Sequence, residues 1–252
     1  MKMIFTDLIV PEWPAPKKVK AFVTLRGNGC STSPYDSFNL SLSVGDTDAN
    51  VKKNREILRK LLPDEPRWLK QVHGTTIVEA DTVLSPLEAD ASFSRHDNIV
   101  CALMIADCIP VLICDKQATV VAAVHAGWRG LLNGILEKSI KGLNIDLSNL
   151  LVYLGPAIGA GAFEIGQDVY DKIISQPSFQ EGEILKHPKS NKWYADLISI
   201  ARNRLTAIEV KNIFESKLCT FNNPNSFFSH RRSNPTGRMA ACIWLEEKPS
   251  KR

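Results

Sequence analysis

Among the histidines and cysteines of this 252-residue chain, whose side chains can bind metal ions or act as nucleophiles, we single out three that lie at or near the edge of an apolar run. His73 ends the segment WLKQVHG, Cys108 lies within MIADCIPVLICD, and His125 lies within VVAAVHAGWRG. Their separations, 35 and 17 residues, do not match local metal-binding motifs, which place ligands in close pairs. We therefore expect these side chains to meet only in three dimensions, as a His₂Cys metal site with an open fourth position.

Zinc is the metal that two imidazoles and one thiolate favour, since three protein ligands leave room for a water that the metal would acidify toward neutral pH. Copper is the alternative, because the same ligand types bind it. A His₂Cys copper electron-transfer site normally adds a weak axial ligand. The nearby methionine is Met104, which we interpret as a core residue.

The same residues also allow a metal-free interpretation, in which Cys108 is a nucleophile and His73 or His125 is its base. Asp107 directly precedes the cysteine, and a carboxylate between two apolar strands needs a partner. It could orient the base only if its side chain turned to the same side as Cys108, because neighbours on a regular strand point to opposite faces. We count Asp107 among the candidate catalytic residues.

Polar and basic side chains near these motifs are candidates for substrate binding. Arg26 and Asn39 flank the Gly-, Ser- and Asn-rich segment that follows the first strand, and Gln71 shares a strand face with His73. Arg129 follows the second histidine motif, and Arg231 lies in a polar segment near the end of the chain. For each of them, an ordinary place in a turn or on a solvated surface is the alternative.

The composition limits the functional class. The chain is 44% hydrophobic and 23% charged, which is typical of a globular protein with a large core. Its net charge of +4 lacks the clustered basic stripe of nucleic-acid-binding proteins, and no apolar run is long enough to cross a membrane. Asp7 and Pro11 interrupt the start of the chain where a signal peptide would be apolar, so we expect a cytoplasmic protein with six free or metal-bound cysteines.

Strand-like and helical patterns alternate along the chain without a strict βαβ rhythm. They predict a single domain over 1–252 of mixed α/β (α+β) class, with layered mixed sheets flanked by helices and a frayed tail at 246–252. We expect an ordered loop over 27–46 and a connection from residue 88. Strands are expected at 19–26, at 67–73 and 75–81 with a turn near Gly74 between them, and at 98–106, 109–115, 119–126, 150–154, 211–216 and 238–245. Helices are expected at 49–62 (capped by Asp46 or Asp48), 130–143, 167–175 and 196–208 (capped by Asp196).

The motifs, taken in order, resemble the YfiH-type laccase-domain family, which is also called polyphenol oxidase-like, purine nucleoside phosphorylase-like or peptidoglycan editing factor. The most specific are QVHG, ADC-x-P and HAGWRG. The resemblance runs from about residue 21 to 245 and includes the segments RGNGCSTSPYDSFNLSLSVGD, EADA, LGPAIGAGAFEIG and FFSHRR…TGRMAACIWL.

This resemblance implies a fold related to cysteine-hydrolase-like toxin domains, and a metal bound by His73, Cys108 and His125. The implied activity is phosphorolysis of purine nucleosides (adenosine, inosine, guanosine and methylthioadenosine) to free base and ribose 1-phosphate, with adenosine deamination as a second reaction. The expected partners are therefore purine nucleosides and phosphate, with Arg26, Arg129 or Arg231 as clamps for phosphate, in a monomer or weak homo-oligomer. A copper-dependent polyphenol oxidase and a metal-independent cysteine hydrolase that edits a peptidoglycan precursor are the alternatives.

Overall fold

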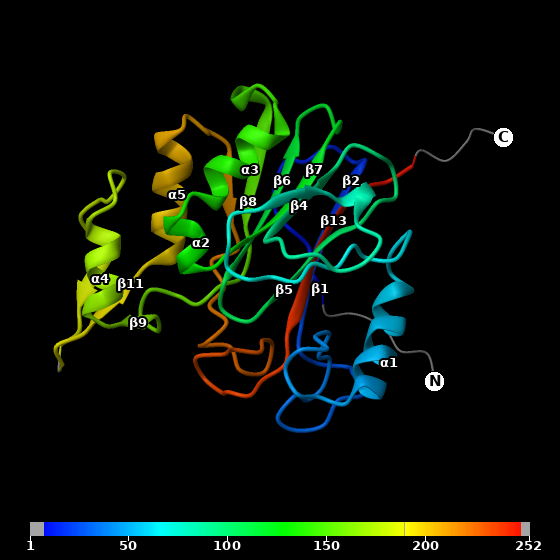
Figure 1. The fold of residues 1–252 in the computed structure, drawn as a ribbon, viewed down its shortest axis with the longest axis horizontal. Coiled ribbons are helices and arrows are strands. Elements are labelled where there is room, and N and C mark those ends of the chain that lie inside the picture. The colour runs from blue at the N-terminus through cyan, green and yellow to red at the C-terminus, as the bar shows by residue number, and fades with distance from the viewer. Residues whose placement is uncertain (1–7, 189, 248–252) are drawn as a thin grey trace.

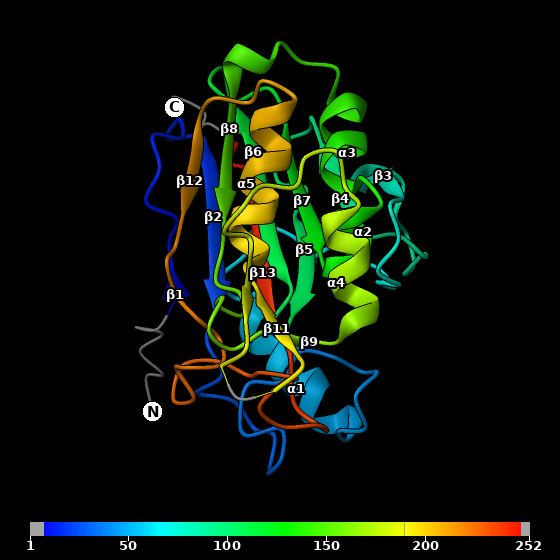
Figure 2. The ribbon, with the colours of Figure 1, turned by 90° about the vertical axis from the view of Figure 1, so that its left-hand side faces the viewer.

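The computed structural model describes residues 8–188 and 190–247, which form four layers in the order helices, sheet, sheet, helix. A six-stranded and a four-stranded sheet pack face to face, and helices cover both outer faces (Figures 1 and 2). The mixed α/β fold expected from the sequence is confirmed.

The six-stranded sheet has three long strands at its centre, which are buried along their whole length. Because both faces of these strands are covered, their sequences are continuously apolar rather than alternating. The middle one of these three strands pairs antiparallel with the other two, and each of the two edge strands of the sheet pairs parallel with its neighbour. The order is β12 (Ile213–Glu215), β8 (Leu150–Leu154), β6 (Ile109–Asp115), β7 (Val121–Ala126), β4 (Ala91–Ser94), β3 (Ile77–Glu79).

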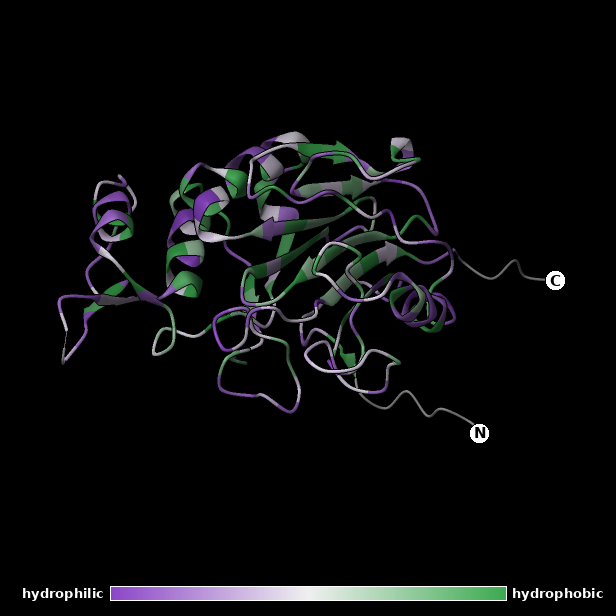
Figure 3. Cartoon of the chain, turned by 60° about the horizontal axis from the view of Figure 1, so that its bottom comes forward, coloured by the Kyte–Doolittle hydropathy of each residue, from purple (hydrophilic) through white to green (hydrophobic). Residues whose placement is uncertain are grey.

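The four-stranded sheet is antiparallel and lies against the inner face of the first. Its order is β1 (Leu8–Ile9), β2 (Val19–Thr24), β13 (Met239–Leu245), β5 (Cys101–Ile105). Alternate residues of β13 point to opposite faces, so Ala241 and Ile243 join the core between the sheets while Cys242 and Trp244 face α1 (Asp48–Arg59). The strands of the two large sheets are mostly green in Figure 3, and α1 is mostly purple.

The outer face of the six-stranded sheet is covered by α3 (Ile135–Leu143) and α5 (Leu197–Ala207), with α2 (Trp128–Leu132) leading into α3. The continuous helix expected over 130–143 is instead two helices, because Gly134 adopts a φ of 88°, a left-handed conformation that interrupts the helix. Two 3₁₀ turns, Ala80–Thr82 and Leu147–Asn149, complete the connections. In the part of the chain that the structure describes, no helix is long and apolar enough to cross a membrane.

A small unit projects from this body (Figure 1). It consists of α4 (Gln167–Ile174) and a three-stranded antiparallel sheet of β10 (Ile184–Lys186), β11 (Trp193–Ala195) and β9 (Glu164–Ile165). Tyr170 of α4 stacks on Trp193 of β11, with ring centroids 4.3 Å apart, which joins the helix to the sheet.

The apolar run 98–115 crosses from one sheet to the other at its expected break. Its first half is β5 of the four-stranded sheet, and its second half is β6, the third strand of the six-stranded sheet. Asp107 makes this turn with a φ of 91°, and Cys108 follows it directly. The cysteine therefore lies where the two sheets separate.

Four further expected details are wrong. Residues 67–73 form isolated bridges at Arg67 and Lys70 rather than a strand. The reason is that the backbone amides of Val72 and His73 donate to the side chain of Asp90 instead of to a neighbouring strand. Residues 91–94 form β4 within a sheet, not a connection. Thr47, without a side-chain cap bond, precedes α1, and that helix ends at Arg59 rather than residue 62.

Asp196 caps α5 as expected, through a hydrogen bond from the Ser199 amide. At the end of the chain, the amide of Glu246 donates to the Lys18 carbonyl, and that of Glu247 donates to Asn98 Oδ1. The remaining residues of the tail, 248–252, lie outside the described residues.

The polar loop 27–46 is ordered around the buried side chain of Asn54 in α1. Asn54 Nδ2 donates to Ser31 Oγ, the Ser37 carbonyl and the Asn39 carbonyl at 3.0, 3.1 and 2.8 Å, and its Oδ1 accepts from the Cys30 amide at 2.8 Å. One side chain thus satisfies several backbone groups that a buried loop would otherwise leave unpaired.

Replacing Asn54 with Ala should lower the free energy of unfolding by about 2–3 kcal/mol, because it leaves several buried polar groups without partners. Urea denaturation would measure the loss. Lys53→Ala, at the exposed neighbouring position of α1, is the matched control and should change stability by about 0.5 kcal/mol or less. Equal losses in the two variants would contradict this role of Asn54.

Candidate metal centre

His73, Cys108 and His125 come together although they are far apart in the sequence. Their candidate ligand atoms all lie within 4.8 Å of one another. Cys108 Sγ lies 3.7 Å from His73 Nε2, and the two imidazole rings lie 4.9 Å apart between centroids. A single ion could contact all three groups after small adjustments of the side chains, as the sequence predicted.

The pairing of β6 with β7 brings two of these residues together. In the ladder, Pro110 pairs with His125 and Ile109 pairs with Ala126, so Cys108 comes opposite Gly127. Both residues therefore lie where the two central strands β6 and β7 end, on the same side of the sheet, and polar groups at strand ends are exposed to ligands. His73 approaches from outside the sheet, in a turn where it adopts a φ of 59°.

The carboxylate of Asp90, immediately before β4, fixes both histidines. It is fully buried and accepts backbone hydrogen bonds from Val72, His73 and Gly74 at 3.2, 2.9 and 2.6 Å. Its Oδ1 lies 2.8 Å from His125 Nδ1, which leaves Nε2 of that ring directed away from Asp90. One side chain therefore sets the turn that holds His73 and the orientation of His125.

Two glycines of the HAGWRG motif make room for the His73 turn. A Cβ atom at Gly127 would lie 2.6 Å from His73 Cδ2 and 3.0 Å from Cys108 Sγ. At Gly130 it would lie 2.7 Å from the Gly74 carbonyl oxygen. Side chains at these positions would push the third ligand away from the other two.

The charges of the three groups depend on each other. Burial raises the pKa of the Cys108 thiol, but the charge and hydrogen bonds of His125 and His73 outweigh it, so that the pKa falls well below its usual range. Burial lowers the pKa of His125, and the Cys108 thiolate and Asp90 reverse this and raise it. The pKa of Asp90 is raised by burial but lowered further by its bonds with His125, Gly74 and Val72. A thiolate beside an imidazolium is therefore the favoured state without an ion.

Asp107, expected among the catalytic residues, has its carboxylate directed away from the imidazoles. Its Oδ1 accepts a 2.6 Å hydrogen bond from Thr220, and its Oδ2 accepts bonds from Ser229 Oγ and the Arg231 amide at 3.0 and 2.7 Å. The residue thus joins the turn before Cys108 to two segments near the end of the chain. The carboxylate that orients a histidine is Asp90 rather than Asp107.

A cavity of about 570 Å³ opens in front of the three ligands. Apolar and aromatic side chains form part of its wall, including Met104, Ile158, Phe163 and Trp128. Basic side chains form another part: Lys70, Arg129, His230, Arg231 and Arg238. The site therefore has the volume of a small-molecule pocket and a positively charged lining.

Three of the five expected substrate-binding residues line this cavity. Gln71 is held by two bonds with the backbone of Met104, which fix its amide at the wall. Arg129 lies with its guanidinium carbon 4.4 Å from the centre of the Trp128 ring, and that of Arg231 lies 5.2 Å from the centre of the Phe163 ring.

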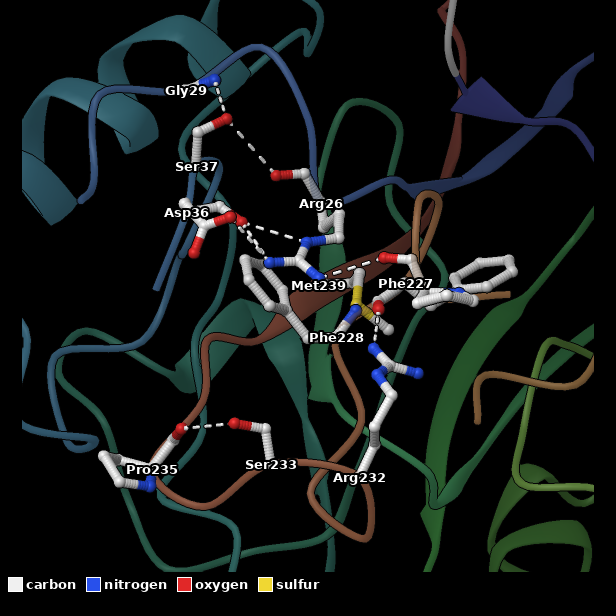
Figure 4. Close-up of polar contacts among 11 residues, drawn as sticks. Arg26, Gly29, Asp36, Ser37, Phe227, Phe228, Arg232, Ser233, Pro235 and Met239 are labelled. Carbon is white, nitrogen blue, oxygen red and sulfur yellow. Dashed lines mark hydrogen bonds and ion pairs between the residues drawn. The ribbon is translucent and has the colours of Figure 1, made fainter. Parts of the chain in front are cut away.

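Arg26 and Asn39 are not among the described residues that line the cavity. The Arg26 guanidinium donates to the Asp36 carbonyl and carboxylate, as Figure 4 shows, and to the Pro224 carbonyl. Asn39 is buried, bonds to Asp46 and Ser41, and accepts the Arg238 amide. Both residues hold the 27–46 loop in place.

Sequence reasoning missed Asp90 and Arg238. Asp90 belongs to the segment EADA, where an acidic residue directly before a buried strand signals a carboxylate that needs partners. Arg238 precedes the last strand and lines the cavity, and its only sequence signal is a charge next to the apolar run MAACIWL.

Comparisons with known proteins agree with the resemblance seen in the motifs. A family model described as multi-copper polyphenol oxidoreductase laccase matches residues 20–246. A Pseudomonas aeruginosa protein named purine nucleoside phosphorylase is 43% identical over 239 residues, covering 95% of this chain and 98% of its own. The Escherichia coli purine nucleoside phosphorylase YfiH is 43% identical over 243 residues, covering 95% of this chain and 99% of its own.

Solved structures share the fold. A crystal structure of a Neisseria meningitidis protein superposes with a TM-score of 0.91 at 40% identity, covering 96% of this chain and all of that one. The YlmD protein of Geobacillus stearothermophilus superposes with a TM-score of 0.83 at 29% identity, over 92% of this chain and 93% of its own. The chain therefore belongs to the multi-copper polyphenol oxidoreductase laccase family, whose members include YfiH.

Proposed function

We propose that this chain is a zinc-dependent purine nucleoside phosphorylase that also deaminates adenosine. The observation that carries this proposal is the convergence of His73, Cys108 and His125 at the wall of a positively charged cavity. The names of relatives that are 41–43% identical over nearly their whole length support the reaction. The substrates we expect are adenosine, inosine, guanosine and methylthioadenosine, each with phosphate.

The residues present suit a zinc ion. Two imidazoles and a thiolate are ligands that zinc prefers, and the low pKa of Cys108 supplies the thiolate form that binds metal. Asp90 bonds to the far nitrogen of His125, which is the usual arrangement around a metal-bound histidine. Bound there, zinc would polarise an oxygen ligand and stabilise negative charge. Copper could use the same ligands, and metal analysis of the purified protein would distinguish the two.

In the proposed phosphorolysis, an oxygen of phosphate bonds to C1′ of the ribose while the bond from C1′ to the purine N9 breaks. The electron pair of the broken bond stays on N9, which takes up a proton, so that the products are ribose 1-phosphate and the free base. The basic side chains of the cavity would neutralise the phosphate, and Phe163 and Ile158 offer apolar surface to the base. Asp107 would be a positioning residue, because its carboxylate accepts the amide of Arg231 and so holds that residue at the cavity.

Deamination of adenosine needs water to replace the amino group at C6 of the base. Chemistry of this kind is known for zinc sites with histidine and cysteine ligands that act on nucleobases. It would use the same cavity, with the base rather than the ribose directed at the three ligands. Inosine formed from adenosine in phosphate-free buffer would identify this reaction, and free base formed only with phosphate would identify phosphorolysis.

A second candidate function is a metal-independent cysteine hydrolase acting on a peptidoglycan precursor. The observation that favours it is the row Cys108, His125, Asp90, in which His125 lowers the pKa of the thiol and the Asp90 carboxylate lies 2.8 Å from His125 Nδ1. Such an enzyme would keep its activity in chelator and lose it on alkylation. Turnover of nucleosides that requires metal would rule against it.

Cys108→Ala and His125→Ala should each abolish stoichiometric metal binding and reduce nucleoside turnover by about 10²-fold or more, because each removes one of three ligands. Elemental analysis and an assay of free-base release would measure both effects. Cys30→Ala, at an exposed cysteine, should change neither. Full phosphorolysis by a metal-free variant would contradict the proposal.

Asp90→Asn should weaken metal binding by about 10- to 100-fold, since an amide cannot accept all four hydrogen bonds of the carboxylate. Competition with a chromogenic chelator would measure the affinity. Asp115→Asn is the matched control: this buried carboxylate accepts backbone bonds from Thr119 and Val120 at the opposite end of β6. It should destabilise the fold but leave metal affinity unchanged, and an equal loss of affinity in both variants would count against a specific role for Asp90.

In metal-free protein, iodoacetamide should alkylate Cys108 at pH 7 faster than Cys30. The thiolate is the form that reacts, and at pH 7 a thiol with a lowered pKa contains more thiolate than a thiol with the usual pKa of about 8.5. The rate should fall only when the pH drops through the lowered pKa. Peptide mapping by mass spectrometry would follow both cysteines, and added zinc should protect Cys108. A Cys108 rate that rises only above pH 8 would show that its neighbours do not stabilise the thiolate.

A further inference from the structure

The lining of the metal-site cavity is selective for negative charge. Besides the candidate metal ligands, five basic residues line it, and Asp107 contributes the one carboxylate among the described lining residues. The two oxygens of that carboxylate already accept three hydrogen bonds within the protein. A ligand entering the cavity therefore meets cationic donors. The negative charge of the Cys108 thiolate would be neutralised by a bound metal ion. An oxyanion fits this lining better than a neutral or cationic group.

Arg238 lies closer to the metal ligands than its place in the sequence suggests. Met239, the first residue of β13, pairs with Ile105 at the end of β5, so Arg238 comes opposite Ala106. Cys108 is two residues further along the chain from Ala106. The Arg238 amide also donates to Asn39 Oδ1 at 2.9 Å, which ties this backbone to the ordered 27–46 loop.

Two other cations of the cavity are already engaged by groups of the protein. Lys70 forms an ion pair with Glu88 at 2.7 Å. Arg231, whose side chain is exposed, donates through Nη1 to the Glu164 carbonyl at 2.7 Å while its guanidinium lies over Phe163, so its remaining donors are solvated.

Arg129 lies on the exposed face of Trp128 at the rim. It is therefore solvated before any ligand arrives, and its side chain is not held in one orientation by hydrogen bonds within the described residues. Both features make it a weaker anion site than a buried, fixed guanidinium.

The guanidinium of Arg238 is held in place but keeps donors available. Its Nη1 donates to the carbonyls of Thr236 and Gly237 at 2.8 and 3.0 Å. Within the described part of the chain, its Nε and Nη2 have no hydrogen-bond partner. A guanidinium held through Nη1, with the N–H groups of Nε and Nη2 left for a ligand, has the adjacent pair of donors by which arginine binds two oxygens of a phosphate.

We infer that Arg238 is the residue that binds inorganic phosphate in this cavity, through Nε and Nη2, next to the three metal ligands. The inference rests on the proposed phosphorylase function and adds to it the residue that receives the co-substrate. Arg129 and Arg231 then shape the rim and wall around the nucleoside. A phosphate group carried by a nucleoside 5′-monophosphate has the same chemistry, and the test separates the two sources.

The test uses full-length, metal-loaded protein in three forms: unchanged, Arg238→Met and Arg238→Lys. Calorimetric titration with inorganic phosphate alone measures binding, and steady-state kinetics measure the KM for phosphate and the KM for inosine. We expect Arg238→Met to weaken phosphate binding and raise the KM for phosphate about tenfold or more, because a charge-assisted pair of bonds is lost. The KM for inosine should change far less. Arg238→Lys should recover part of the phosphate binding through its charge.

Arg59→Met, on α1 and outside the cavity lining, is the control and should behave as the unchanged protein. Thermal unfolding and metal content show whether each variant is folded. If the Arg238→Met variant does not fold, the phosphate binding and phosphate KM of Arg238→Lys test the inference instead. Phosphate binding and phosphate KM that are unchanged in a folded Arg238 variant would overturn the inference, and so would loss of binding to adenosine 5′-monophosphate alone.

The two proposals fail in different ways. If the unchanged protein phosphorolyses nucleosides but its Arg238 variants keep the same KM for phosphate, the function stands and this inference is wrong. If the unchanged protein turns over no nucleoside but binds phosphate through Arg238, the proposed function is wrong and the oxyanion site stands.

Discussion

The candidate metal centre depends on one buried carboxylate with four hydrogen-bond donors. Asp90 receives three consecutive backbone amides from the turn that contains His73 and a fourth bond from the ring of His125. A buried carboxylate without such partners would be strongly unfavourable, so the turn and the histidine ring stabilise Asp90 as much as Asp90 positions them. The backbone carbonyl of Asp90 also accepts the His125 amide at 2.7 Å, which ties the carboxylate to β7 itself. Two of the three candidate ligands are therefore set by a residue that does not reach the cavity.

A second buried carboxylate does the same for the other wall of the site. Asp107 turns the chain from the four-stranded to the six-stranded sheet and binds Thr220, Ser229 and the Arg231 amide. These contacts place Cys108 at the start of β6 and bring against it the segment before β13, which carries three of the basic residues of the cavity, His230, Arg231 and Arg238. The two carboxylates divide the task, since Asp90 fixes the imidazoles and Asp107 fixes the thiol and the cationic wall. Neither is free to act as a general base without losing bonds that shape the site.

The sequence predicts best those features that depend on apolar pattern. The buried strands β5, β6, β7, β8 and β13 follow from continuous apolar runs, and the three candidate ligands stand out because each lies near the edge of such a run. The pattern fails where side chains bond to backbone. Residues 67–73 look like a strand, but the Asp90 carboxylate takes the amides of 72–74 that a strand would use. Arg26 and Asn39 look like ligand-binding groups, but they bond within the protein, to Asp36 and Asp46 of the 27–46 loop and to Pro224 and the Arg238 amide near the end of the chain. Whether a polar side chain serves the fold or a ligand depends on such contacts, which spacing does not encode.

The contacts around His73 bear on the choice between a metal enzyme and a thiol enzyme. Cys108, His125 and Asp90 alone would form a thiolate–imidazolium pair with an orienting carboxylate, and that arrangement needs no third donor. His73 nevertheless lies 3.7 Å from the sulfur, in a turn that adopts a left-handed φ of 59°, which is unfavourable for a residue with a side chain. Three amides bonded to Asp90 hold that turn, and Gly127 and Gly130 must lack side chains for it to fit. A second imidazole beside a cysteine that already has one has little use in proton transfer, but it completes the three-ligand set that zinc requires. The structural features that place His73 are therefore better explained by metal binding than by a cysteine nucleophile.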